Sequence, residues 1–270
     1  MLGFIGTLLL LAACAPRPAV EVKPLPGVKV TVPVATPQGA TAVESGKKGG
    51  LPAIKVLPGN SLPEPGTAFT DDFSKYPTGA VLPAVAPDRY GLLRRGDWQK
   101  VSVTEAFDPS GRLDKAVRLE GGYGEGFLTT GSPDWTDYRI SMRIKVQEAC
   151  CTDSHFRARL FLDGAGGRAL EFQLGYEGAK LVKLAGDQSF VLVDRPELRD
   201  VGRAFLRDGN WHDLVFELKG DGTVRAVLDG TELLVWKDPD YRQGGFGIGP
   251  KNITFFLDDL RIERLVAKGS

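Results

Sequence analysis

The sequence has few cysteines and histidines, and its charges cancel. Its 270 residues include three cysteines and two histidines, and 34 basic residues balance 34 acidic ones. A chain without excess positive charge gives no reason to expect nucleic acid as a partner. His155 and His212 lack the spacing of a metal-ligand pair, and no G-x-S-x-G nucleophile elbow is present. The motifs therefore identify no catalytic residue.

The sequence also lacks an apolar run long enough to cross a membrane, which takes about 20 residues. The apolar run 2–13 is shorter and is typical of a signal-peptide core. It ends in Leu11-Ala12-Ala13-Cys14, which resembles a bacterial lipobox. The resemblance implies cleavage before Cys14, a lipid on that cysteine, and an extracytoplasmic protein anchored to a membrane of the bacterial cell envelope. An ordinary secretory signal or a short membrane anchor is the alternative. The run departs from the signal-peptide pattern in one respect, because no Lys or Arg precedes it.

The two remaining cysteines, Cys150 and Cys151, are adjacent. No long-range disulfide can then form within one chain. Ordinary disulfides join Cα atoms about 4.4–6.8 Å apart, whereas adjacent Cα atoms lie about 3.8 Å apart. The pair is therefore either a strained vicinal disulfide or two buried thiols.

Residues 15–66 contain no aromatic residue but hold ten of the eighteen prolines. Such a segment cannot form a core that offsets the entropy lost on ordering. The composition changes at Phe69, and all tryptophans and tyrosines lie beyond it. We predict a signal peptide at 1–13, a lipidated cysteine and disordered Pro-rich linker at 14–67, and one folded domain at 68–266.

Apolar and polar residues alternate in several short segments of that domain. Alternation with period two is typical of antiparallel strands that cover a core with one face. Gly- and Asp-rich turns separate the segments, and no convincing helix exceeds two turns, although 196–205 could hold one turn. The pattern predicts an all-β fold, an antiparallel sandwich of two sheets. The clearest strand segments are 138–146, 156–162, 170–176, 212–218 and 224–228.

An ordered series of motifs resembles laminin G-like and concanavalin A-like domains. The segments DGNWHDLVFEL at 208–218 and GDGTVRAVLDG at 220–230 carry most of the likeness. GFGIG at 245–249, FLDDLRI at 256–262 and DDF at 71–73 complete it. The resemblance implies a concanavalin A-like jelly roll whose first and last strands lie side by side.

Domains of this kind occur in lectins, adhesion proteins, carbohydrate-binding modules and sugar hydrolases, including those of the keto-disaccharide type. We expect non-catalytic binding of a glycan or another component of the cell envelope. A sugar hydrolase is the second hypothesis, although the E-x-D-x-x-E motif of the jelly-roll glucanases is absent. A structural adaptor that binds an envelope protein through a sandwich edge or the loop 150–155 is the third.

The candidate ligand-binding residues are polar side chains on three predicted strands. If these consecutive strands are neighbours, the side chains form one cationic platform suited to an anionic glycan or envelope polymer. The alternative is a solvated face with internal ion pairs, including one between Glu171 and Arg157 or Arg159. The residues are Arg139, Arg143, Lys145, Arg157, Arg159, Glu171 and Gln173.

Asp71 and Asp258 lie near the two ends of the domain and share strand parity with apolar residues. A buried carboxylate must be paired, hydrogen-bonded or bound to a metal. Related sandwiches often hold a structural calcium where the first and last strands meet, so calcium is a candidate cofactor here. Capping of backbone N–H groups is the alternative.

Overall fold

The computed structural model describes residues 61–95, 100–121 and 125–266. The predicted signal peptide, Cys14 and all but the last residues of the predicted linker lie outside this range. In the described part of the chain, no helix is long and apolar enough to cross a membrane.

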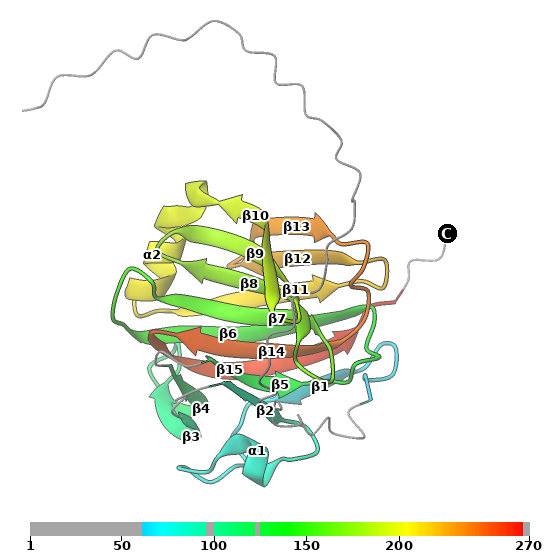
Figure 1. The fold of residues 1–270 in the computed structure, drawn as a ribbon. Coiled ribbons are helices and arrows are strands. Elements are labelled where there is room, and N and C mark those ends of the chain that lie inside the picture. Colours follow the sequence, from blue (N-terminus) through cyan, green and yellow to red (C-terminus); the bar gives the residue numbers. More distant parts are fainter. Residues whose placement is uncertain (1–60, 96–99, 122–124, 267–270) are drawn as a thin grey trace, which may run out of the picture. The chain divides into compact units, whose positions relative to one another are not determined.

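The described residues form two antiparallel sheets that pack face to face (Figure 1). Sheet A contains, in spatial order, β13 (Thr231–Lys237), β12 (Thr223–Leu228), β11 (Trp211–Leu218), β6 (Tyr138–Ala149), β15 (Ile253–Arg264), β4 (Leu113–Glu120) and β3 (Lys100–Phe107). Strand β1 (Ala68–Asp71) pairs with β15 beside this path. Sheet B contains β10 (Gln188–Arg195), β9 (Gly178–Ala185), β8 (Arg168–Gly175), β7 (His155–Leu162), β14 (Gly245–Lys251), β5 (Glu125–Thr130) and β2 (Gly91–Arg95). The predicted two-sheet antiparallel sandwich is confirmed.

The alternating residues separate as the sequence predicts. In β6, every second residue from Tyr138 to Val146 is buried, whereas the residues that alternate with them are half-buried on the outer face. Partners from sheet B, such as Phe156 and Phe172, fill the space between the sheets. Burial of each such side chain stabilises the fold by about 1.5–3 kcal/mol.

The first and last strands lie side by side, as the jelly-roll resemblance implies. Residues Ala68 to Asp71 pair with Glu263 to Leu260 in antiparallel register. Two aromatic side chains anchor this end, because Phe73 is fully buried and lies near the ring of Tyr90.

Helical structure is more extensive than the single turn expected in 196–205. A 3₁₀ turn, η1 (Pro196–Leu198), leads into α2 (Arg199–Arg207), a nine-residue helix. The helix forms because Phe205 and Leu206 bury one side of it, and because Gly202 has no Cβ to collide with the carbonyl oxygen of Gly175. A second short helix, α1 (Leu82–Val85), was not expected from the sequence.

Candidate functional site

The predicted cationic platform does not exist as one surface. Strand β6 lies in sheet A between β11 and β15, whereas β7 and β8 are neighbours in sheet B. The chain passes from one sheet to the other after Ala149, so the two consecutive strands pack across the core instead of side by side. The expectation that the three strands are neighbours is therefore wrong for β6.

The residues that fall on sheet A are largely joined in ion pairs. Arg139 bridges Glu217 and Glu263, with N–O distances of 2.6 and 2.9 Å. Arg143 bridges Asp258 and Asp259 and lies 5.5 Å from the Trp211 ring centre.

Lys145 is half-buried and pairs in register with Trp211 on the same face. The outer face of sheet A therefore resembles the alternative of internal ion pairs more than an open anion site.

The residues on sheet B form a buried polar cluster. Arg159 Nε donates to Glu171 Oε2 at 3.0 Å, and Gln173 Nε2 donates to Glu171 Oε1 at 2.9 Å. The guanidinium groups of Arg157 and Arg159 lie 4.8 and 4.1 Å from the ring centre of Phe127 on β5. The pairing of Glu171 with an arginine of the neighbouring strand is confirmed.

Glu171 is held in its ionised form. Burial alone raises the pKa of a carboxyl group, but the charges of Arg157 and Arg159 and the hydrogen bond from Gln173 outweigh burial here. The pKa of Glu171 therefore lies below its usual range. Both oxygen atoms of this carboxylate already accept hydrogen bonds from the protein.

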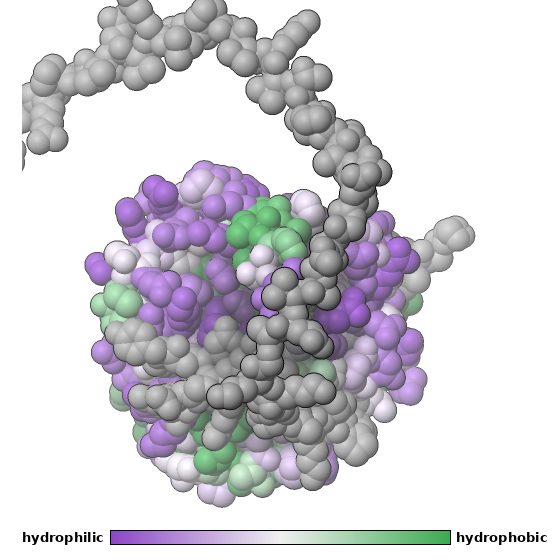
Figure 2. Space-filling view, in the orientation of Figure 1, coloured by the Kyte–Doolittle hydropathy of each residue, from purple (hydrophilic) through white to green (hydrophobic). Residues whose placement is uncertain are grey.

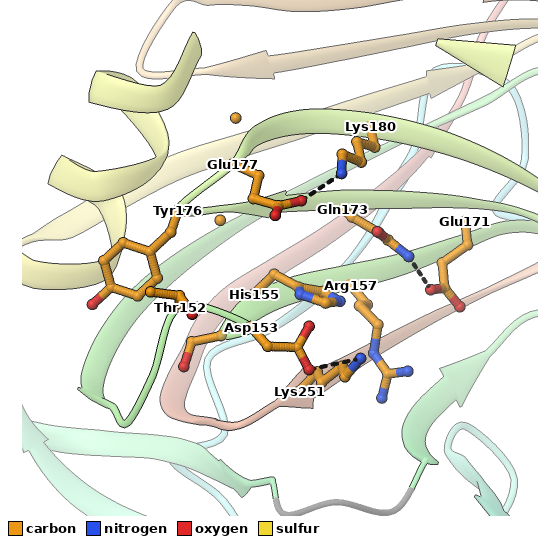
Figure 3. A pocket seen from close by; sticks show the side chains of 13 residues that line it. Thr152, Asp153, His155, Arg157, Glu171, Gln173, Tyr176, Glu177, Lys180 and Lys251 are labelled. Atoms are coloured by element: carbon orange, nitrogen blue, oxygen red, sulfur yellow. Dashed lines mark hydrogen bonds and ion pairs between the residues drawn. The ribbon is translucent and has the colours of Figure 1, made fainter. Parts of the chain in front are cut away.

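A polar pocket of about 270 Å³ opens beside this cluster (Figure 3). The loop after β6 forms one wall, the turn between β8 and β9 forms another, and strand residues form the floor. Polar or charged side chains line most of it, and Tyr176 supplies its aromatic ring. The lining side chains labelled in Figure 3 are Thr152, Asp153, His155, Arg157, Glu171, Gln173, Tyr176, Glu177, Lys180 and Lys251.

The charges of the pocket lining cancel. The three acidic residues Asp153, Glu171 and Glu177 face the three basic residues Arg157, Lys180 and Lys251. Lys180 bridges Glu177 at 2.5 Å, and Lys251 bridges Asp153 at 3.1 Å. The pocket therefore offers many hydrogen-bonding groups without an excess of either charge.

His155 adds a neutral group to the pocket. Burial, followed by the charges of Arg157 and Lys251, lowers the pKa of its imidazole to about 4. Its Nε2 atom is buried and has no hydrogen-bond partner among the described residues. Leaving a buried polar atom unpaired costs about 1–3 kcal/mol. Such unpaired atoms are uncommon in native structures, and a functional role is one explanation for them.

The other histidine is held in the packed, hydrogen-bonded state that the sequence favours. The two ring nitrogens of His212 lie 2.7 Å from Asp229 Oδ2 and 3.1 Å from Asp208 Oδ1. The ring also packs against Phe205, with the ring centres 5.3 Å apart.

The donors around Asp71 support capping rather than calcium binding. Its carboxylate accepts hydrogen bonds from the hydroxyls of Tyr76 and Tyr90 and from the backbone N–H of Phe73, and Lys75 neutralises it. In the described ranges, no group of three or more His, Cys, Asp or Glu side chains is placed to hold a metal ion.

Asp258 also caps a backbone group and pairs with a cation. It accepts hydrogen bonds from the N–H of Asp259 and from Arg143. Its register partner is Arg143, which places Asp258 on the outer face of sheet A and not toward the core. Burial, together with the charge of Asp259, raises the pKa of Asp258 to about 6.

The two adjacent cysteines are exposed thiols. Their Sγ atoms lie 2.9 Å apart, beyond the 2.03–2.05 Å of a disulfide bond. The expectation of two buried thiols is therefore wrong, because the residues lie in the loop after β6 and outside the sandwich.

The predicted site residues Arg157, Glu171 and Gln173 all line the pocket. Arg159 does not line it but donates a hydrogen bond to Glu171. Sequence reasoning did not identify Glu177, Lys180 or Lys251 as site residues. Glu177 lies in the turn before β9, Lys180 lies on β9 and Lys251 ends β14, so only the pairing of the strands brings Lys251 to the same place as the other two.

A second surface feature lies on β10, the edge strand of sheet B. Phe190 and Val191 are 50% and 62% exposed. Figure 2 shows an apolar patch in the region of β10, with hydrophilic residues beside it. Exposed apolar edge strands can pair with other chains, and a bulge such as that between Val191 and Val193 limits such pairing.

Comparisons with known proteins bear on the fold. No protein-family model and no curated protein sequence match the chain. Among solved structures, the cellulose-induced protein Cip1 is similar with a TM-score of 0.51 and 16% identity, over 74% of this chain and 100% of that one. The carbohydrate-binding module CBM66 from Bacillus subtilis has a TM-score of 0.45 and 15% identity, over 65% and 97% of the two chains. Domain 4 of AbnA, an extracellular arabinanase from Geobacillus stearothermophilus, has a TM-score of 0.42 and 17% identity, over 66% and 84%. At these identities, the likeness to Cip1 establishes a shared β-sandwich fold.

Proposed function

We propose that this chain is an exported bacterial lipoprotein whose β-sandwich binds a glycan, without catalysis, in the pocket on sheet B. The observation that carries the proposal is the pocket lining, which presents carboxylate, amide, guanidinium and ammonium groups within one cavity of about 270 Å³. A saccharide offers hydroxyl groups that both donate and accept hydrogen bonds, so it matches a lining of mixed donors and acceptors.

The balanced charge of the pocket favours a neutral glycan over an anionic one. The anionic hypothesis depends on one joined platform of arginines and lysines, and the structure divides those residues between two sheets. In the pocket, Lys180 and Lys251 are already neutralised by Glu177 and Asp153. A polyanion would have to compete with these internal ion pairs.

The state of the carboxyl groups favours binding over hydrolysis. A glycosidase needs a general acid whose pKa is raised. The pKa of Glu171 is lowered, and so is that of Glu177, because Lys180 donates a hydrogen bond to it. The carboxyl group of Asp258, whose pKa is raised, lies on the other sheet.

A glycan array followed by titration calorimetry tests the proposal. The protein is the chain from residue 14 onward with Cys14→Ser, which removes the lipid site. The double variant Glu177→Ala/Lys180→Ala removes two charged side chains that line the pocket and keeps the net charge. It should weaken binding about tenfold or more, because hydrogen bonds to charged groups contribute about 1.5–3 kcal/mol.

The matched control is Arg225→Ala/Glu232→Ala, which removes an ion pair from sheet A. The control should leave the affinity unchanged. Equal affinity in both double variants, or the absence of any glycan ligand on the array, would contradict the proposal.

The tether has its own test. Cys14→Ser in the full chain should move the protein from the membrane fraction to the soluble fraction, or leave an uncleaved precursor. A single acyl chain anchors a protein only marginally, so the several chains of a lipoprotein account for stable attachment. Membrane association that Cys14→Ser does not change would count against lipidation.

The exposed edge strand β10 supports an adaptor role as a second candidate function. Phe190 and Val191 could pair with a strand of an envelope protein. Val191→Lys should then abolish partner capture while leaving glycan affinity unchanged. A partner that binds the lysine variant equally well would exclude this edge.

A further inference from the structure

The two exposed thiols occupy a defined position at the end of β6. Cys150 follows the last residue of the strand, and Cys151 begins the loop whose next residues line the pocket. The thiol of Cys150 donates to Cys151 Sγ, with the sulfur atoms 2.9 Å apart. Both side chains are exposed to solvent, so a reagent can reach either sulfur.

Hydrogen bonds hold this loop in place. The hydroxyl of Ser154 accepts a hydrogen bond from the N–H of Cys151 and donates one to the carbonyl oxygen of Asn252. The N–H of Cys150 donates to the same carbonyl at 3.2 Å. The backbone on both sides of the pair is therefore fixed to the turn between β14 and β15. The adjacency of the two sulfur atoms follows from the fold.

The two thiols differ in their environment. The hydrogen bond from Cys150 lowers the pKa of Cys151. The same hydrogen bond raises the pKa of Cys150. Since the thiolate is the nucleophile in thiol chemistry, Cys151 is the better attacking group of the pair.

A bond between these sulfur atoms would be reversible. Adjacent Cα atoms lie about 3.8 Å apart, closer than the 4.4–6.8 Å of an ordinary disulfide. Strained and exposed disulfides are the easily reduced ones, whereas structural disulfides resist reduction. Such a pair is suited to exchange and poorly suited to stabilising the fold.

We propose that Cys150 and Cys151 form a thiol–disulfide exchange site that takes small-molecule disulfides as its substrate. The Cys151 thiolate attacks one sulfur of the substrate, forms a mixed disulfide and releases one thiolate. Cys150 then loses its proton and attacks the Cys151 sulfur, which forms the vicinal disulfide and releases the second thiolate. The two protein thiols are oxidised, the substrate disulfide is reduced to two thiols, and the two protons pass to solvent or to the released thiolates.

The test follows the reduced chain from residue 14 onward, carrying Cys14→Ser, during incubation with oxidised glutathione. Acid-quenched samples are analysed by intact mass, and released glutathione is counted. The protein should lose two hydrogens and release two glutathione molecules per chain. Excess reduced glutathione should restore the original mass.

Single variants separate the two roles. Cys150→Ser should stop at one stable glutathione adduct on Cys151. Cys151→Ser should form its adduct on Cys150 more slowly, because the remaining thiol is not activated by a neighbouring one. A repeat in urea shows whether the fold matters, since unfolding should slow the closure step.

Three outcomes would overturn the inference. The first is a wild-type chain that retains glutathione adducts without forming the vicinal disulfide. The second is equal reaction rates of the two single variants. The third is closure that is as fast in urea as in buffer. None of these outcomes depends on glycan binding, so the exchange site is tested independently of the proposed function.

Discussion

Neutralising Glu171 tests whether the buried polar cluster of sheet B depends on its charge. Glu171→Gln keeps the size and shape of the side chain but removes the negative charge between Arg157 and Arg159. Glu171 is 4% exposed, and its carboxylate accepts hydrogen bonds from Arg159 at 3.0 Å and Gln173 at 2.9 Å. Breaking a buried ion pair by removing one partner costs about 3–5 kcal/mol, because the other charge remains buried.

We therefore expect Glu171→Gln to lower the free energy of unfolding by about 3 kcal/mol at pH 7. For a domain of this size, about 1 kcal/mol shifts the thermal midpoint by roughly 2–4 °C, so the midpoint should fall by about 6–12 °C. Urea denaturation followed by tryptophan fluorescence measures the free energy. The control Glu232→Gln removes an exposed charge and should cost about 1 kcal/mol or less.

The pH dependence gives a second criterion. The pKa of Glu171 in the folded state is lower than its ordinary value of 4.5. Its charge therefore stabilises the fold fully above the unfolded pKa, and this contribution is lost as the pH falls through the folded pKa. The difference between wild type and Glu171→Gln should be constant from pH 7 to about pH 5.5 and should shrink below pH 4.5. A cost below 1 kcal/mol at pH 7, or a difference that does not change with pH, would refute the assignment of Glu171 as a buried carboxylate clamped by arginines.

Three further expectations concern stability. Asp71→Ala should lower the free energy of unfolding in urea by about 3 kcal/mol, because two buried tyrosine hydroxyls lose their acceptor. A chelator should leave the thermal midpoint of the wild type unchanged, and a lower midpoint would support the calcium hypothesis. The pKa of His155 in the folded state, about 4, lies below its ordinary value of 6.5, so this residue makes the free energy of unfolding fall as the pH drops from 6.5 to 4. His155→Gln should therefore flatten the plot of that free energy against pH in this range. An unchanged slope would contradict the assignment of His155 as a buried neutral imidazole. Truncation before Phe69 should change the free energy of unfolding little, whereas truncation past Phe73 should lower it by about 3–5 kcal/mol or more, since that ring is fully buried. Limited proteolysis should cut the chain before residue 67 and leave the rest intact. Early cuts within 70–265 would place the domain boundary elsewhere.

The strands could be predicted from the sequence because their signal is local. Alternation in 138–146 and 156–162 reports which side chains face a core, and β6 and β7 contain these segments. Helix α2 was underestimated because the segment is only nine residues long and contains Gly202, which lowers helix propensity. Its stability comes from Phe205 and Leu206, which pack on the sandwich, and this contact depends on the tertiary structure.

The candidate site was predicted only in part, and the missing part depends on strand order. Local sequence places Arg157, Glu171 and Gln173 on outer faces of their strands, and β7–β8 pairing brings them together as expected. Arg143 has the same local pattern, yet it belongs to the other sheet because β6 pairs with β11 and β15. Composition and alternation thus determined an all-β sandwich with polar outer faces, since both follow from burial of neighbouring residues. Only the tertiary structure decided which charged residues share a surface, because the pairing of strands far apart in the sequence depends on how the two apolar faces pack together.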